Sequence, residues 1–317
     1  YIDPPFATKS EFGGQDGERS YADKVDASEF IEALRERLIY LRELLADDGS
    51  IYIHLDQKMN HYVKIVMDEV FRKENFLNEI IWHYQAGTAP LKGFAKKHDN
   101  IIVYVKSKGI NIFNQVRLLV KDESIYPMVD ENGRKYRMSG NNNATRYYAD
   151  EGRKADDVWT WLDRKENNVV QVFHALPEHL GYPTQKPEKL LERIIWASSN
   201  NDDIVMDCFA GSGTTVAVAE RLGRRWIACD FGKHAIYTMQ RRMLRISESK
   251  ALIDEKDKSG KVIVKKGDPY KKDPKPFCII SSGAYDFSHV MDLRKHKETY
   301  IDFVLGLFQL SRDDDKV

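Results

Sequence analysis

The sequence predicts an α/β fold in which short strands alternate with amphipathic helices. Apolar residues at helical spacing follow runs of β-branched residues in two regions, at about residues 26–106 and 183–247. In the second region a glycine-rich turn joins a strand to a helix, which is typical of nucleotide-binding sheets. Because strands joined through helices pair in parallel by right-handed crossovers, we expect a parallel sheet.

The composition indicates a globular cytoplasmic protein. The 317 residues contain 42% hydrophobic side chains, enough for one large core or two modest ones. No apolar run approaches the roughly 18 residues of a membrane span, and no signal peptide is visible. Three widely spaced cysteines match no disulfide or zinc pattern, so we expect a reducing compartment and no metal. With 49 basic and 49 acidic residues, any surface for nucleic acid must be local.

The first residues, Tyr1 and Ile2, read as the end of a strand that turns at Asp3-Pro4-Pro5-Phe6. Proline lacks a backbone N–H, so this corner offers a carboxylate and carbonyl oxygens beside a flat ring. Such a corner suits a planar group with an amino function, although a structural Pro-Pro turn is an equal alternative. Since so little of a strand precedes Asp3, we expect an N-terminally trimmed chain, whose activity the sequence leaves open.

The next elements continue the alternation. Residues 7–25 are polar and glycine-containing, and we interpret them as a flexible lid or substrate-contacting arm. Asp26 and Glu29 form a capping box that opens a helix, which Gly49 ends. A strand at 50–56, a second helix at 59–70, and strands at 79–84 and 100–106 follow. His54 is interpreted as structural.

The alternation stops between residues 109 and 182. Basic side chains lie there among tyrosines and asparagines, and such residues contact phosphates and base edges. The neighbouring acids favour the plainer interpretation, an insertion with a solvated face. The candidates for contact with nucleic acid are Arg134, Lys135, Arg137 and Arg146.

The second alternation contains the nucleotide-binding features. A helix beginning near Pro187 is expected to bury Leu190, Leu191, Ile194 and Ile195, and a buried strand then ends at Asp207. After the glycine-rich turn and its helix, a strand ends at Asp230, which is placed to accept hydrogen bonds from a ribose. Val216 replaces the third glycine of the dinucleotide fingerprint, and Asp207 disfavours a pyrophosphate. These features favour S-adenosylmethionine, which carries positive charge, over NAD.

Beyond residue 245 the pattern fades. We interpret the lysine-rich stretch 250–275 as a solvated linker with a hairpin around 262–264. An apolar helical stripe runs from Val290 to Leu307, and the acidic end is expected to fray.

Three motifs in this order resemble the β-class DNA amino-methyltransferases: Asp3–Phe6, Thr184–Pro187 and Asp207–Thr215. Residues 37–56 and 79–82 also resemble the modification subunits of type III restriction systems, and the resemblance covers residues 1–245. It implies a Rossmann-like S-adenosylmethionine-dependent methyltransferase fold with circularly permuted motif order, whose halves share one sheet. The implied parts are a catalytic half (1–108), a target-recognition insertion (109–182), a cofactor-binding half (183–247) and a C-terminal extension (248–317).

The resemblance also implies the chemistry. The chain would methylate the exocyclic amino group of adenine in double-stranded DNA, within a restriction-modification system. The Asp3 carboxylate and the Pro4 carbonyl would each accept an amino hydrogen, while Phe6 stacks on an extruded base; Pro5 completes the corner. The implied cofactor residues are Asp207, Phe209, Ala210, Gly211, Ser212, Gly213, Thr214, Asp230, Thr184, Gln185 and Lys186, with Lys186 near the cofactor carboxylate.

Several alternatives stay open from the sequence. The amino group could belong to cytosine, RNA or a protein amide. A NAD-dependent oxidoreductase and a non-catalytic DNA-binding module are more remote, because Val216 and the Asp-Pro-Pro-Phe corner argue against the first and the complete motifs against the second. The sequence also leaves open a homodimer, a restriction subunit as partner, and the recognition sequence.

Overall fold

The computed structural model describes residues 1–5, 11–13, 19–22, 27–85, 90–120, 122–139, 145–162, 169, 178–253, 255–256 and 262–281. The chain forms two units, Tyr1–Lys275 and Pro276–Val317. The account below concerns the first unit. The helical stripe expected from Val290 to Leu307, the capping residue Asp26 and most of the expected lid lie outside the described residues. Within the lid region, β1 (Glu11–Gly13) and β2 (Arg19–Ala22) pair as an antiparallel hairpin, where the sequence predicted a flexible loop.

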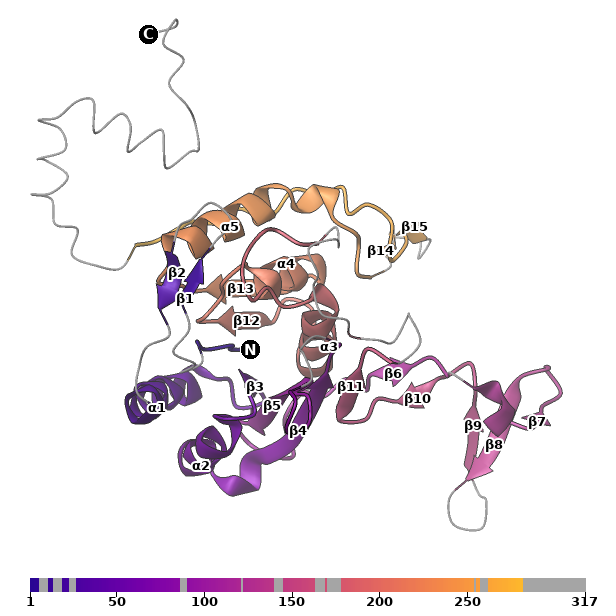
Figure 1. Ribbon diagram of the computed structural model, residues 1–317. Helices are drawn as coiled ribbons and strands as arrows, with labels where there is room; N and C mark the ends of the chain where they lie inside the picture. The colour runs from indigo at the N-terminus through magenta and orange to yellow at the C-terminus, as the bar shows by residue number, and fades with distance from the viewer. Residues whose placement is uncertain are drawn as a thin grey trace, which may run out of the picture. The chain divides into compact units, whose positions relative to one another are not determined.

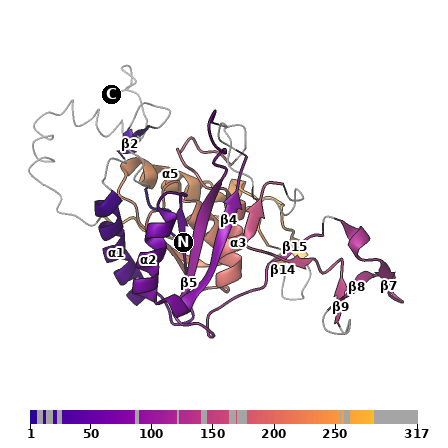
Figure 2. The same cartoon turned by 60° about the horizontal axis from the view of Figure 1, so that its bottom comes forward.

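The larger sheet contains four strands in the order β11-β4-β5-β3 (Figures 1 and 2). Its strands are β3 (Ser50–Leu55), β4 (Phe76–His83), β5 (His98–Val105) and β11 (Val158–Thr160). Here the expected parallel sheet was wrong, because β5 runs antiparallel to both β3 and β4, and only β11 and β4 pair in parallel. The described residues between β4 and β5 form no helix, so these strands pair directly as a hairpin instead of crossing over.

Helices α1 (Ala27–Leu44) and α2 (Asn60–Phe71) cover one face of this sheet (Figure 2). Phe30, Leu34 and Leu38 recur every fourth residue of α1, so they share one face, and all three are buried. They join a core with residues of α2 and of β3 and β5, including Met67, Phe71, Ile53, Leu55, Ile102 and Tyr104. Full burial of such a side chain stabilises the fold by roughly 1.5–3 kcal/mol.

Helices α3 (Glu188–Ser198) and α4 (Thr214–Arg221) pack against the opposite face. The predicted buried face of α3 is confirmed, since Leu190, Leu191, Ile194 and Ile195 belong to the core that includes Trp82 and Val103. Next along this part of the chain come β12 (Ile204–Asp207), β13 (Arg225–Ala228) and α5 (Lys233–Leu244). Elsewhere the described residues also form 3₁₀ turns at Lys73–Asn75, Glu123–Ile125 and Ile246–Glu248. Strands β12 and β13 pair in parallel, as predicted.

The first two residues join the two sheets. Ile2 pairs in parallel with Ile53 of β3, donating its N–H to Tyr52 at 2.9 Å and accepting from the His54 N–H at 2.9 Å. On the other side, the Tyr1 amino group donates to the Met206 carbonyl of β12 at 3.1 Å. The expectation that the Asp3 and Asp207 segments lie side by side is therefore confirmed.

Two predictions of burial were wrong. Ile204 was expected in a buried strand but is 55% exposed, because β12 has a full strand partner only in β13. Residues 250–275 were expected to form a solvated linker. Residues 265–269 and 271–273 are exposed as expected, but Ala251, Leu252 and Tyr270 are buried, and Leu252 packs into the α3–α4 core. The predicted hairpin is present as β14 (Glu255–Lys256) and β15 (Val262–Val264).

The region between β5 and α3 contains two small antiparallel sheets. Strand β6 (Arg117–Leu118) pairs with β10 (Arg153–Lys154). Strands β7 (Met128–Val129), β8 (Lys135–Ser139) and β9 (Thr145–Tyr148) form a three-stranded sheet. This region is thus more ordered than an irregular insertion. None of the helices among the described residues is long and apolar enough to cross a membrane.

Candidate active site

A cavity of about 520 Å³ brings together the predicted residues of the three motifs. It opens beyond the carboxyl ends of the Ile2 segment, β12 and β13, which is where ligands of α/β sheets bind. The predicted residues that line it are Asp3, Pro4, Pro5, Thr184, Lys186, Asp207, Phe209, Ala210, Gly211, Ser212, Thr214 and Asp230. Gln185 and Gly213 are not among its lining residues, and Phe6 lies outside the described residues.

The Asp-Pro-Pro corner is held at the mouth of the cavity by the pairing of Ile2 with β3. Pro4 is buried and Pro5 is exposed. The carboxylate of Asp3, with 17% of its side chain exposed, contacts the ammonium of Lys186. The corner therefore has a charged acceptor whose position is fixed from two directions, by the sheet and by a distant lysine.

The glycine-rich turn needs glycine at two positions. Gly211 has φ 48° and Gly213 has φ 73°, in the left-handed region that side chains disfavour. A Cβ on Gly213 would lie 2.6 Å from Met239 Cγ, and one on Gly211 would lie 3.3 Å from Tyr182 Cε1. The turn can therefore approach α5 and the cavity wall only without side chains at these positions.

Asp207 holds this turn through two hydrogen bonds. One carboxylate oxygen accepts the Phe209 N–H at 3.0 Å and the other accepts the Thr215 hydroxyl at 2.5 Å. Burial raises the pKa of Asp207 to about 6, although the hydrogen bonds from Thr215 and Phe209 act in the opposite direction. Each oxygen of a carboxylate has two lone pairs, so Asp207 can still accept a hydrogen bond from a cation in the cavity.

Asp230 follows β13 and fixes two loops. Its Oδ2 accepts the Gly211 N–H and its Oδ1 accepts the Gly232 N–H, both at 2.8 Å. The carboxylate also lines the cavity, so its remaining lone pairs can accept from hydroxyl groups of a ligand.

The segment before α3 closes the cavity from the other side. Thr184 has φ 61°, a strained conformation for a β-branched residue and one that clusters at ligand sites. The Gln185 amide is buried and turned towards its own segment, since it donates to the Glu178 carbonyl at 2.6 Å and accepts from the Leu180 N–H at 3.0 Å. The Gln185 side chain therefore stabilises the fold of this segment, whereas Thr184 and Lys186 line the cavity.

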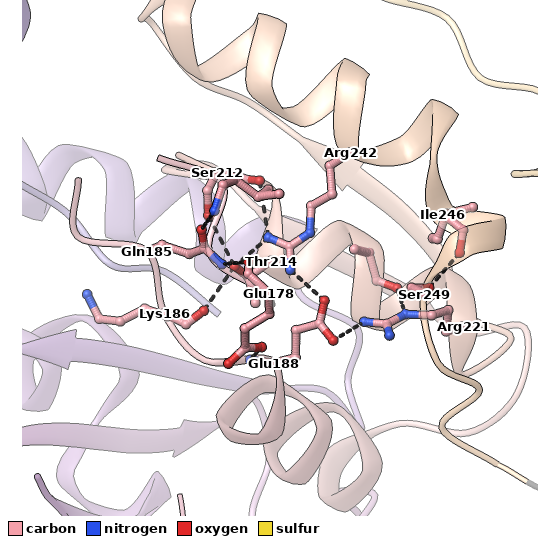
Figure 3. Close-up of polar contacts among 12 residues, drawn as sticks. Glu178, Gln185, Lys186, Glu188, Ser212, Thr214, Arg221, Arg242, Ile246 and Ser249 are labelled. Carbon is pink, nitrogen blue, oxygen red and sulfur yellow. Dashed lines mark hydrogen bonds and ion pairs between the residues drawn. The ribbon is translucent and has the colours of Figure 1, made fainter. Parts of the chain in front are cut away.

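A buried ionic network, which the sequence did not reveal, ties this segment to the glycine-rich turn (Figure 3). Glu188 contacts Arg242 and Arg221, each at 2.7 Å. Arg242 also donates to the Thr214 hydroxyl at 2.9 Å, and Thr214 donates to the Lys186 carbonyl at 3.1 Å. Burial alone would raise the pKa of Glu188, but the two arginines hold that pKa below its ordinary value. The network thus fixes the start of α4 against the start of α3.

Other lining residues were missed from the sequence. Phe231 is fully exposed and lines the cavity directly after Asp230. Its place next to the acid was the one signal that could have indicated it. Tyr182 is buried and stacks on His234, with ring centroids 5.3 Å apart and planes 8° apart. Phe231 and Tyr182 therefore both offer aromatic surface near the glycine-rich turn.

His54 is fully buried beside the corner. Its ring nitrogens contact the Tyr1 hydroxyl at 2.8 Å and the Asp99 carboxylate at 3.1 Å, and Tyr84 donates to the same carboxylate at 3.0 Å. This satisfied network agrees with the structural role predicted for His54. Among the described residues, no cluster of three His, Cys, Asp or Glu side chains could hold a metal ion.

The four basic candidates for contact with DNA lie on and beside the β7-β8-β9 sheet, in different electrostatic surroundings. Arg134 contacts Asp150 at 2.7 Å and Glu151 at 3.2 Å, and Lys135 contacts Glu123 at 3.1 Å. Arg137 lies over Tyr126 and Tyr147, with its guanidinium carbon 5.6 and 5.8 Å from the ring centroids. Arg146 lies 5.1 Å over Tyr136. The ion pairs therefore compensate the first two charges, whereas Arg137 and Arg146 are held by aromatic rings.

The chain is similar in sequence to known proteins. Residues 1–241 match the DNA methylase family, whose members methylate amino groups. The chain belongs to the DNA methylase family. The type II methyltransferase M.EcaI of Enterobacter cloacae is 29% identical over an alignment that covers 76% of this chain and 63% of the relative. The chain thus spans less than two thirds of that relative.

Two further relatives agree with this assignment, and one solved structure shares the fold. The type II methyltransferase M1.MboII of Moraxella bovis is 30% identical, covering 72% of this chain and 82% of its own. The DNA adenine methyltransferase YhdJ of Escherichia coli (strain K12) is 30% identical over an alignment that covers 77% of this chain and 74% of the relative. The PvuII DNA methyltransferase (cytosine-N4-specific) is 15% identical with a TM-score of 0.51, covering 76% and 77%. The Rossmann-like methyltransferase fold predicted from the sequence is confirmed.

DNA methylases of this family use S-adenosylmethionine, and the cavity fits this cofactor. Its volume lies in the range of small-molecule sites, and glycines keep one wall free of side chains. The Asp207 and Asp230 carboxylates suit a ligand with an ammonium group and ribose hydroxyls.

Proposed function

We propose that this DNA methylase transfers a methyl group from S-adenosylmethionine to the exocyclic amino group of adenine in double-stranded DNA, as the modification activity of a restriction-modification system. One observation carries the proposal: the Asp3-Pro4-Pro5 corner and the Asp207–Asp230 wall face a single cavity. An amino acceptor site and a cofactor site that share a cavity suit direct transfer between two ligands.

The corner supplies the acceptors that the reaction needs. The amino nitrogen of adenine is a poor nucleophile because its lone pair is delocalised into the ring. The Asp3 carboxylate and the Pro4 carbonyl, by accepting one amino hydrogen each, favour a tetrahedral nitrogen with a localised lone pair. This is catalysis by positioning and electrostatics. The base must first leave the stack, at roughly a few kcal/mol, and we propose that Phe6 then stacks on it.

The opposite wall holds the cofactor. We propose that Asp230 accepts from the ribose hydroxyls, that the turn at residues 209–214 with Asp207 holds the methionine portion, and that Thr184 closes the pocket. Phe231 offers the flat surface for the adenine ring. When bound, S-adenosylmethionine supplies an electrophilic methyl group on a sulfonium. The buried Glu188–Arg242 network keeps the turn in place while ligands exchange.

Contact with DNA is assigned to the insertion at residues 109–182, the proposed target-recognition region. Side chains alternate between the two faces of β8 and β9. Arg134, Tyr136 and Arg146 belong to one face, where Arg134 is bound by Asp150 and Glu151. Arg137 and Tyr147 pair on the other face, where the exposed guanidinium lies near the rings of Tyr126 and Tyr147. The aromatic rings orient Arg137 without neutralising it, which suits binding to a phosphate or a guanine edge.

The target base is the finer part of the proposal. An aspartate in the first position of the corner resembles adenine-specific enzymes, whereas cytosine-amino enzymes more often carry serine there. YhdJ is named as an adenine methyltransferase, and the PvuII enzyme, which shares only the fold, is named as specific for cytosine N4. Cytosine N4 is therefore the second candidate, because its amino group presents the same two hydrogens.

The test uses labelled S-adenosylmethionine with mixed-sequence duplex DNA, RNA and protein extract as acceptors. We expect label in duplex DNA alone, and N6-methyladenine after digestion to nucleosides. N4-methylcytosine in its place would reassign the base and keep the enzyme class. Label in RNA or protein, with none in DNA, would overturn the proposal.

A further inference from the structure

Lys186 spans the cavity from the cofactor side to the catalytic corner. Its carbonyl accepts the Thr214 hydroxyl at 3.1 Å, and Arg242 fixes Thr214 in turn at 2.9 Å. Figure 3 shows its ammonium directed away from this network. At its far end, the ammonium contacts Oδ2 of Asp3, 183 residues earlier in the chain. One residue therefore joins the cofactor-binding turn to the catalytic acid.

The charges around the cavity explain why the ammonium lies at Asp3. The lining carboxylates are Asp3, Asp207 and Asp230, and the basic residues among the lining residues are Lys186 and Arg37. Arg37 donates to the Ala33 carbonyl on its own helix at 2.6 Å. Asp207 and Asp230 have both oxygens bound by backbone N–H groups of the glycine-rich turn and of the Asp230 loop, or by the Thr215 hydroxyl of α4. Asp3 is the lining carboxylate whose charge is balanced by a lysine.

The contact orients the Asp3 carboxylate. A carboxylate that is bound through one oxygen no longer turns freely about its Cβ–Cγ bond. With Oδ2 held by Lys186, Oδ1 has no partner among the residues that the structure describes and can accept an amino hydrogen. Side-chain exposures of 13% for Lys186 and 17% for Asp3 keep water from competing effectively for the pair.

We propose that Lys186 is a positioning residue for Asp3 and not a ligand of the cofactor carboxylate. It holds the Asp3 carboxylate aimed at the target amino group, and it relays the position of the cofactor-binding turn to this carboxylate. This inference rests on the proposed function. On this inference the Lys186 ammonium lies at Asp3, and not near the cofactor carboxylate as the sequence suggested.

The two roles differ in what removal of the ammonium changes. Lys186→Met keeps the length of the side chain and removes its charge. A positioning role predicts that kcat falls by roughly 100-fold while the Kd for S-adenosylhomocysteine, which retains the carboxylate, changes by less than about threefold. Lys186→Arg should recover part of kcat, because its guanidinium can also bind Asp3. Lys73→Met, on an exposed 3₁₀ turn before β4, is the matched control and should alter neither quantity.

A readout without turnover separates this inference from the proposed function. Thermal unfolding of the ligand-free wild type, Asp3→Asn, Lys186→Met and the double variant forms a double-mutant cycle. If Asp3 and Lys186 interact, the Tm shift of the double variant should be smaller than the sum of the Tm shifts of the two single variants. Additive shifts, or a Kd weakened as much as kcat in Lys186→Met, would overturn the inference. Absence of methyl transfer by the wild type would instead overturn the proposed function, leaving the cycle and the Kd to decide the role of Lys186.

Discussion

The amino group of Tyr1 donates a 3.1 Å hydrogen bond to the carbonyl of Met206, and this contact places Asp3 beside Asp207. Strand pairing of Ile2 with β3 fixes the other side of the same short segment. The proposed catalytic corner and the proposed cofactor-binding wall thus meet through backbone hydrogen bonds, although they are far apart in the sequence. Their separation by an insertion does not disturb the cavity because the sheet, and not the chain order, sets its geometry.

Asp3→Ala should abolish methyl transfer and keep cofactor binding. The substitution removes the charged acceptor of the amino group, and loss of such an acceptor reduces kcat by roughly 10³-fold or more. Asp230 and the glycine-rich turn are untouched, so calorimetry with S-adenosylhomocysteine should still give binding. Turnover at the wild-type rate by this variant would contradict the proposed role of the corner.

Gly213→Ala should weaken cofactor binding, whereas Gly133→Ala should not. Both glycines have positive φ, 73° and 78°, so each alanine incurs roughly 1–2 kcal/mol of backbone strain. At Gly213 the new Cβ would also lie 2.6 Å from Met239, whereas at Gly133 nothing lies within 4 Å. We expect similar strain but displacement of the turn only in Gly213→Ala, with the Kd for S-adenosylhomocysteine raised by about tenfold or more. Equal Kd values for the two variants would show that the close packing on α5 is unimportant.

Arg137→Ala should weaken binding to duplex DNA by about tenfold and reduce the slope of log K against log salt concentration by about 1. Its guanidinium is exposed and oriented by Tyr126 and Tyr147, so its removal should leave Tm nearly unchanged. Arg245→Ala is the matched control, since Arg245 is exposed and bound to Glu248 outside the insertion. Fluorescence anisotropy at several salt concentrations measures both quantities. If the two variants bind DNA alike, the β8–β9 face with Arg137 is not the contact surface.

The sequence was informative where local chemistry fixes local structure. Asp3 and Asp230 were predicted as site residues because a rigid proline corner and a strand ending in an acid can be recognised within a few residues of sequence. The buried face of α3 was predicted because its apolar residues repeat at helical spacing. Each of these features depends on neighbours in the chain.

The features that were missed depend on partners far away in the sequence. The residues of β5 are those of any buried strand, and its direction follows from the connection to β4, which lacks a helix in its described part. The contact of Lys186 with Asp3 was not predicted, because only packing brings this side chain to a residue 183 positions away in the sequence. Arg242 and Glu188 carry no local sign of burial, since charged residues on helices are usually exposed.

The raised pKa of Asp207 predicts a pH dependence of stability. Burial holds its folded-state pKa at about 6, above the ordinary value of 3.8, so the folded protein binds a proton more tightly than the unfolded chain. Stability from this group is therefore greatest below the ordinary pKa and is lost as the pH rises through about 6, by roughly 2–3 kcal/mol in total. Asp207→Asn cannot ionise and removes this dependence. Chemical denaturation at pH 4.5 and 7.5 should show that the variant gains stability relative to the wild type at the higher pH, whatever constant cost arises from its altered bonds to Phe209 and Thr215. A difference between the two proteins that stays the same at both pH values would contradict the raised pKa of Asp207.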